Sequence, residues 1–190
     1  MPADPSALAD SVRLAWPAEA GAIAALQRRA WAAALPAAVA DPLLHGVDVA
    51  EMTSAWSAVL GRPADARQRV LVAIDAGSAE SRLVGFATTV PAQDDDAEPG
   101  VDGEVDQFWI DPAAQRRGHG SRLLNACADT LRADGFRRAR WWVGATDDVL
   151  RAFLTGAGWA PDGAHREIGS EDGTVRFRQV RLHTDLGDGS

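Results

Sequence analysis

Residues 104–124 read EVDQFWIDPAAQRRGHGSRLL, and this stretch decides the fold. Its β-rich first part predicts a strand over 104–110 that Asp111-Pro112 ends. Three apolar residues spaced by four, Leu123, Cys127 and Leu131, predict an amphipathic helix over 118–134. A strand, a glycine-bearing loop and a helix are therefore expected to follow one another.

The loop before this helix is a candidate phosphate-binding site. Gly118 and Gly120 let the main chain approach a ligand closely, and the helix N-terminus presents unpaired N–H groups at the positive end of its dipole. Polar side chains that can bond phosphate oxygens surround these glycines: Arg116, Arg117, Ser121 and Arg122. The alternative is an ordinary turn with surface arginines. The loop has neither the Walker pattern nor the third glycine of a dinucleotide-binding fingerprint.

Hydrophobic periodicity in the rest of the chain predicts a mixed α/β or α+β fold around one central sheet. Strands are expected over 12–15, 69–74, 83–90, 138–143, 165–168 and 175–182. Helices are expected over 17–35, 49–60 and 147–157. Residues 41–48 are expected to be a loop that either contacts the substrate or is a plain connector, and 91–103 a flexible acidic loop.

Length and composition fit a single domain over 1–190. The chain has 190 residues, of which 46% are hydrophobic, enough to bury a core of its own. We expect the core to span about 12–182, with flexible tails over 1–10 and 184–190.

The charge and residue counts exclude several classes of protein. A net charge of −8 gives no basic footprint, so nucleic acid and anionic membranes are not expected as partners, and a cationic or amine-bearing ligand is favoured. No apolar run approaches the ~20 residues of a membrane helix, and no signal peptide is recognisable. The single cysteine and four histidines show no metal-ligand spacing, so we expect a cytoplasmic protein without a metal.

Three motifs together resemble one family. Residues 115–120, QRRGHG, resemble the Q/R-x-x-G-x-G/A signature of the GNAT superfamily of N-acetyltransferases. The run EVDQFWIDP before it is similar to that family's fourth strand, and AFLTGAGW over 152–159 resembles its F-Y-x-x-x-G-F stretch. The resemblance implies a mostly antiparallel sheet of six to seven strands flanked by about four helices. It also implies transfer of an acetyl group from acetyl-CoA to a primary amine, by direct attack in a ternary complex.

The resemblance also implies which residues form the site. Main-chain amides of the loop would hold the CoA pyrophosphate, and the pantetheine arm would lie along the preceding strand. The residues that correspond to CoA-binding positions are Phe108, Trp109, Ile110, Gln115, Arg116, Arg117, Gly118, His119, Gly120, Ser121, Asp147 and Phe153. Glu104 stands six residues before Ile110, where many members carry a glutamate base, and Asp106 is the second candidate.

The sequence departs from the family pattern at the general acid. The chain contains no tyrosine, and Leu154 stands where the family's tyrosine is found. The alternative function is therefore an acyl-CoA-binding sensor or interaction module without transferase activity. The acceptor stays open between a small-molecule and a peptide amine, and the resemblance is compatible with a homodimer. The alternative interpretation of Glu104 is a solvated residue at the end of a strand, without a catalytic role.

Overall fold

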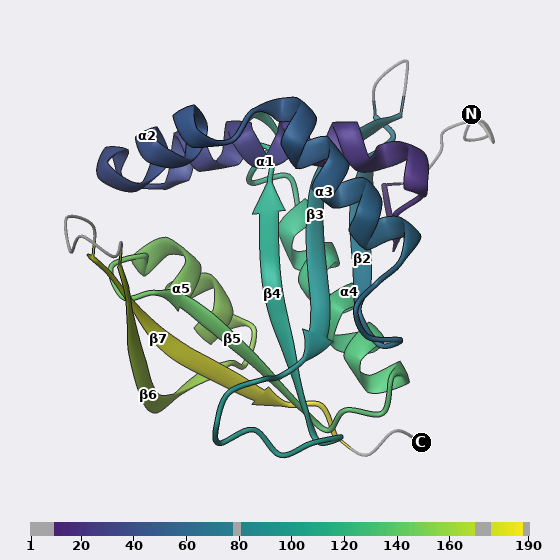
Figure 1. Cartoon of the computed structure of the whole chain (residues 1–190). Coiled ribbons are helices and arrows are strands. Elements are labelled where there is room, and N and C mark those ends of the chain that lie inside the picture. The colour runs from purple at the N-terminus through teal and green to yellow at the C-terminus, as the bar shows by residue number, and fades with distance from the viewer. Residues whose placement is uncertain (1–9, 78–80, 170–175, 188–190) are drawn as a thin grey trace, which may run out of the picture. The chain divides into compact units, whose positions relative to one another are not determined.

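The computed structural model describes residues 10–77, 81–169 and 176–187. Seven strands form one sheet in the order β1-β2-β3-β4-β5-β7-β6, in agreement with the predicted fold class (Figure 1). The strands are β1 (Ser11–Leu14), β2 (Arg69–Asp75), β3 (Arg82–Pro91), β4 (Asp102–Ile110), β5 (Arg138–Gly144), β6 (Ala160–Gly169) and β7 (Arg176–Asp185). The predicted tail over 1–9 and the last residues, 188–190, lie outside the described residues.

Five α-helices are present in the described part of the chain, where about four were expected. They are α1 (Ala20–Ala34), α2 (Ala37–Gly46), α3 (Val49–Gly61), α4 (His119–Ala133) and α5 (Asp148–Gly156). Two short 3-10 helices, η1 (Pro17–Glu19) and η2 (Pro112–Ala114), precede α1 and α4.

The contacts divide the chain into two compact units, which are described separately. The first runs to Thr88 and includes Gln107–Cys127, and the second comprises Thr89–Asp106 and the residues from Ala128 on. Strand β4 contributes its first half to the second unit and its last four residues to the first. The predicted single domain over 1–190 stays a prediction.

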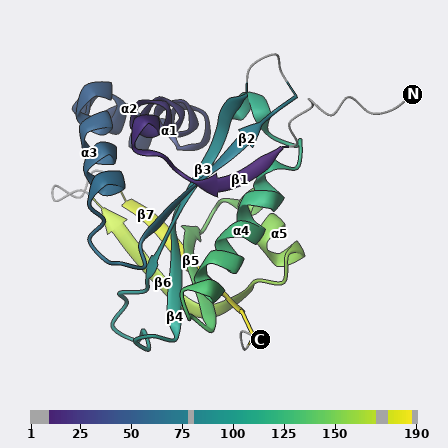
Figure 2. The same cartoon turned by 90° about the vertical axis from the view of Figure 1, so that its right-hand side faces the viewer.

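In the first unit, α1 and α3 cover one face of β1–β3, and the start of α4 lies on the other face (Figure 2). The predicted apolar stripes of the two helices are confirmed as core: Ile23, Leu26, Ala30, Met52 and Trp56 pack with strand residues. The indole of Trp56 donates from Nε1 to Gln27 Oε1 at 2.8 Å, so this aromatic ring belongs to the core.

The second unit is built on β5 and β7. Strand β5 runs parallel to the first residues of β4, with Asp102 opposite Arg138, and antiparallel to β7. Strand β6 pairs antiparallel with β7, with a register shift between Pro161 and His165. Helix α4 continues into this unit, where Gly103 lies against Leu131.

The prediction of a loop over 41–48 was wrong, because α2 occupies most of this segment. Pro42 lies inside α2 and hides its helical pattern. The carbonyl oxygens at its C-terminal end are satisfied from another element: Arg28 on α1 donates to the Leu44 carbonyl at 2.8 Å and also to that of Val47. This support is tertiary, so no local sequence signal announces it.

The predicted tail from Thr184 begins too early. Strand β7 continues to Asp185, which pairs with Arg138 on β5. Leu186 is buried, and its N–H donates to the Arg137 carbonyl at 2.8 Å. Pairing with β5 and burial of one leucine therefore order residues that look like a polar end in the sequence.

Gly85 on β3 provides a first prediction, because β4 leaves no room for a side chain there. A Cβ at Gly85 would stand 2.6 Å from Ile110 Cδ1 and 3.1 Å from the Trp109 carbonyl oxygen. Gly85→Ala is expected to lower the free energy of unfolding by ~1–3 kcal/mol through overpacking, measured by chemical denaturation. Gly156→Ala is the control, since nothing lies within 4 Å of its Cβ position; an equal loss in both variants would contradict the packing argument.

Candidate functional site

The loop between β4 and α4 has the strand–loop–helix geometry that the sequence predicts. Asp111 ends β4 and caps η2, its carboxylate accepting from the Ala113 N–H at 3.0 Å. The chain then adopts left-handed conformations at Arg116 (φ 59°) and Gly118 (φ 86°), and α4 begins at His119. A left-handed conformation is uncommon for a residue other than glycine. The first N–H groups of α4 follow these two residues directly and, as at any helix start, have no intrahelical acceptor.

The arginines of this loop are partly engaged by carboxylates. Arg117 Nη1 lies 2.8 Å from Asp75 Oδ2, and Arg122 Nη1 lies 3.2 Å from Asp10 Oδ2. Both guanidinium groups remain about half exposed, at 52% and 47%, so each keeps N–H donors directed to solvent. They fix the loop to the β1–β2 edge and still contribute positive charge beside it.

The other predicted loop residues divide by exposure. Gln115, Arg116 and Ser121 are exposed, and Gly120 is half-buried. His119 is an exception, because its side chain is 1% exposed. The expectation that the main-chain amide at this position takes part in CoA binding stays a prediction.

The end of β4 lies in the first unit, beside the start of the loop. The N–H of Gln107 donates to the Thr88 hydroxyl at 3.0 Å, so at this position β4 uses a side-chain acceptor. The side chain of Trp109 packs against the core formed by α1 and α3, and its Nε1 donates to Gln107 Oε1 at 2.9 Å. Phe108, Trp109 and Ile110 are all half-buried. Their main chain is the part that a strand-like ligand would pair with.

Glu104 lies in the second unit, on β4 and opposite Arg140 of β5. Burial raises the pKa of its carboxyl from 4.5 to about 7, and the negative charges of Asp94 and Asp106 act in the same direction. Arg166 and Arg140 oppose the shift without cancelling it. Glu104 is therefore poised to exchange a proton at neutral pH, while Asp106, the second candidate base, is exposed.

A network of arginines and carboxylates surrounds this part of the second unit. Arg140 and Arg181, each about 5% exposed, both bind Asp96, with their nearest contacts at 3.0 and 2.6 Å. The hydrogen bond from Arg181 holds the pKa of Asp96 well below its ordinary value. Arg181 also binds Asp94 at 3.0 Å, and the indole of Trp142 donates to the same carboxylate at 3.1 Å.

This network anchors the acidic part of 91–103, which the sequence predicts to be a flexible loop, through ion pairs. The side chain of Asp94 is only 16% exposed. The sequence shows an acidic run but not its partners, because Arg140 and Arg181 are 44 to 87 positions away. The sequence shows that β5 and β7 carry several arginines, but it does not show which carboxylate each arginine binds.

The remaining predicted residues, Asp147 and Phe153, lie at the start of α5 and within it, in the second unit. Asp147 is the N-cap of α5 and accepts from the Leu150 N–H at 2.9 Å. Phe153 is half-buried. Leu154, at the position of the family's tyrosine, is fully buried, so no polar side chain projects from α5 at this point.

Comparison with known proteins identifies the family. The model of the acetyltransferase (GNAT) family matches residues 45–159, which is more than half of the chain. The chain belongs to the GNAT family. The match includes β4, the loop and α4, so the residues that carried the resemblance lie inside it.

Relatives of this GNAT protein include enzymes with different acceptors in their names. It is 30% identical over 116 residues to the phosphinothricin N-acetyltransferase of Streptomyces coelicolor, an alignment that spans 60% of this chain and 65% of that one. The structure of a phosphinothricin acetyltransferase from Sinorhizobium meliloti, in complex with AcCoA, matches with a TM-score of 0.70 and 20% identity over 96% of this chain and 91% of that one. The structure of the ribosomal-protein-alanine N-acetyltransferase of Brucella melitensis matches with a TM-score of 0.68 and 18% identity. The match covers 92% of this chain and 99% of that one.

The structural neighbours show that this GNAT protein shares their fold. Within the residues described, no helix has the length and apolar character needed to cross a membrane. The predicted fold class is confirmed, while the roles of individual site residues stay predictions.

The raised pKa of Glu104 predicts a pH-dependent stability. Between about pH 4.5 and 7 the folded chain holds a proton that the unfolded chain releases, so the free energy of unfolding falls as pH rises through this window. Denaturation at several pH values should show this fall in the wild type and not in Glu104→Gln, with the exposed Glu167→Gln as the control. Parallel profiles for wild type and Glu104→Gln would contradict the shift.

Proposed function

We propose that this protein is an acetyl-CoA-dependent N-acetyltransferase that moves an acetyl group to a primary amine by direct attack in a ternary complex. Family membership and a structural neighbour in complex with AcCoA support the donor. The observation that carries the proposal is the loop 115–121, where two left-handed residues precede the N-terminus of α4. Such a terminus favours anions such as a diphosphate.

The described residues fit an acetyl-CoA donor at this loop. The amides of residues 116–121 would bind its pyrophosphate, and the half-exposed Arg117 and Arg122 would add positive charge. The main chain of Phe108–Ile110 would pair with the pantetheine arm. An N–H near Trp109 or Ile110 would polarise the thioester carbonyl, a contribution of ~3–4 kcal/mol per donor in acyl transfer.

Glu104 is the proposed base. The nitrogen of the acceptor attacks the thioester carbon, forming the C–N bond while the C–S bond breaks. The amine gives its proton to Glu104, directly or through water, which the pKa of about 7 allows near neutral pH. The leaving thiolate takes a proton from water, because Leu154 is apolar and buried where the family has a tyrosine. Asp106 is the second candidate for the base.

The acceptor is proposed to be a cationic small molecule or a peptide amine. The net charge of −8 favours the approach of cations, and the relatives' names include both phosphinothricin and a protein alanine. A cytoplasmic location and a homodimer also stay predictions from the sequence. The second candidate function, a CoA-binding module without turnover, is favoured by the missing tyrosine.

The loop assignment predicts that Gly120→Trp abolishes CoA binding, because the indole would fill the space beside the amides. Calorimetry with CoA measures this directly. Gly46→Trp is the matched control, since Gly46 ends α2 at the surface and nothing lies within 4 Å of its Cβ position. Unchanged affinity in Gly120→Trp would exclude the loop as the diphosphate site.

The base assignment predicts that Glu104→Gln lowers kcat by ~10²-fold or more near pH 7. Thiol release from acetyl-CoA with a panel of amines measures the rate. In the wild type, kcat/KM should rise as pH passes about 7, and this rise should be lost in Glu104→Gln. A normal Glu104→Gln combined with an impaired Asp106→Asn would transfer the role to Asp106. CoA binding without thiol release for any amine would favour the binding module.

A further inference from the structure

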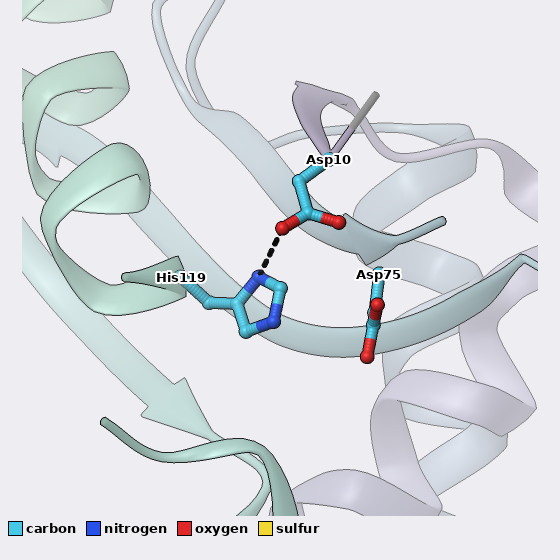
Figure 3. A group of neighbouring side chains, drawn as sticks. All are labelled: Asp10, Asp75 and His119. Carbon is cyan, nitrogen blue, oxygen red and sulfur yellow. Dashed lines mark ion pairs between the residues drawn. The ribbon is translucent and has the colours of Figure 1, made fainter. Parts of the chain in front are cut away.

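Three ligand-type side chains from separate segments meet on the first unit. Asp10 precedes β1, Asp75 ends β2 and His119 begins α4. One ligand atom from each lies within 4.8 Å of the other two, and Figure 3 shows the imidazole directed toward the carboxylates. The sequence spacing of 10, 75 and 119 gives no hint of this cluster.

The imidazole of His119 is buried without a hydrogen bond. Its side chain is 1% exposed, and neither Nδ1 nor Nε2 has a hydrogen-bond partner among the described residues. Asp10 Oδ2 is 3.9 Å from Nδ1, which is beyond hydrogen-bond distance. A buried polar group without a partner is costly and calls for an explanation. The two carboxylates beside it make a bound cation the most direct one.

The two carboxylates are oriented by groups that leave acceptor positions free. Asp75 accepts from the Gly77 N–H at 3.0 Å and from Arg117 at 2.8 Å. Asp10 accepts from the Ala76 N–H at 3.1 Å, and Arg122 lies 3.2 Å away. A carboxylate has about four lone-pair positions, so each of these can still bind an ion. Hydrogen bonds of this kind orient the ligands of metal sites.

We propose that Asp10, Asp75 and His119 bind a divalent transition metal, of which zinc is the best match. One imidazole nitrogen and two carboxylate oxygens are ligands that zinc accepts at ~2.0–2.2 Å, so the three atoms, which lie within 4.8 Å of one another, would move closer together on binding. Mg²⁺ and Ca²⁺ prefer oxygen-only shells, and the imidazole therefore disfavours them.

The nearby arginines set the character of the site. Arg117 and Arg122 together offset the charge of the two carboxylates, which lowers the attraction for a purely ionic ligand. Their side chains are about half exposed, so solvent screens this effect. The bond to the His119 nitrogen then carries a large part of the selectivity.

A metal here would join the start of α4 to the ends of β1 and β2. It would bind to His119 within the loop 115–121 without requiring that the loop bind CoA. The role is structural: the ion stabilises the first unit by binding the folded and not the unfolded chain. Failure of the proposed function would leave this inference intact, and the reverse also holds.

Zinc titration tests the site. Calorimetry of the full-length chain, first stripped with EDTA and then dialysed, should show one equivalent of Zn²⁺ bound and an accompanying rise in Tm. Asp10→Asn should weaken zinc binding by at least ~10-fold. Loss of a residue that only orients a metal ligand already lowers metal affinity by this factor, and loss of a ligand should lower it at least as much. The controls are Asp111→Asn, a buried carboxylate paired with Arg29 away from the cluster, and His45→Ala, an exposed histidine; both should bind zinc as the wild type does.

The imidazole ¹⁵N spectrum of the wild-type protein provides a second readout. Zinc should shift one His119 nitrogen resonance, assigned by its absence in His119→Leu, and leave those of His45 and His165 in place. This readout decides the matter if Asp10→Asn does not fold by circular dichroism. No binding tighter than ~1 mM, or binding of equal strength in wild type and folded Asp10→Asn, would overturn the proposal.

Discussion

The path of the main chain through Arg116 and Gly118 is the constraint on which the site depends. Both residues adopt left-handed backbone conformations, and together they redirect the chain from the end of β4 into the first turn of α4. Glycine adopts this conformation without cost, whereas arginine does not. The pairs Arg117–Asp75 and Arg122–Asp10 hold the loop in place from the β1–β2 edge. The same arginines thus provide both the loop's anchoring and its positive potential.

Charge is distributed differently in the second unit. The acidic segment between β3 and β4 looks like a source of repulsion in a chain with a net charge of −8, but its carboxylates neutralise the buried Arg140 and Arg181. Glu104 differs from these neighbours, because no arginine among the described residues forms a close ion pair with it. Burial raises the pKa of its carboxyl to about 7, and the charges of nearby aspartates act in the same direction.

The proposed chemistry is asymmetric. A carboxyl group with a pKa of about 7 provides a base, while no tyrosine is available to protonate the leaving thiolate. A thiolate is a stable leaving group compared with an amine, since an ordinary thiol has a pKa of about 8.5. Activation of the nucleophile is therefore the step for which this chain is best equipped. The side chain of the buried His119 has no part in this proposed chemistry. In the proposed metal site it would instead stabilise the start of α4.

The sequence by itself determined the strand–loop–helix of residues 104–134, the mixed sheet and the family, because period-two and period-four patterns and glycine positions are local signals. It also identified Glu104 as the candidate base. Tertiary structure alone decided α2, the last residues of β7, the partners of Asp94 and Asp96, and the meeting of Asp10, Asp75 and His119. Each of these depends on groups far apart in the chain, and burial and pairing of such groups leave no periodic trace in the order of the residues.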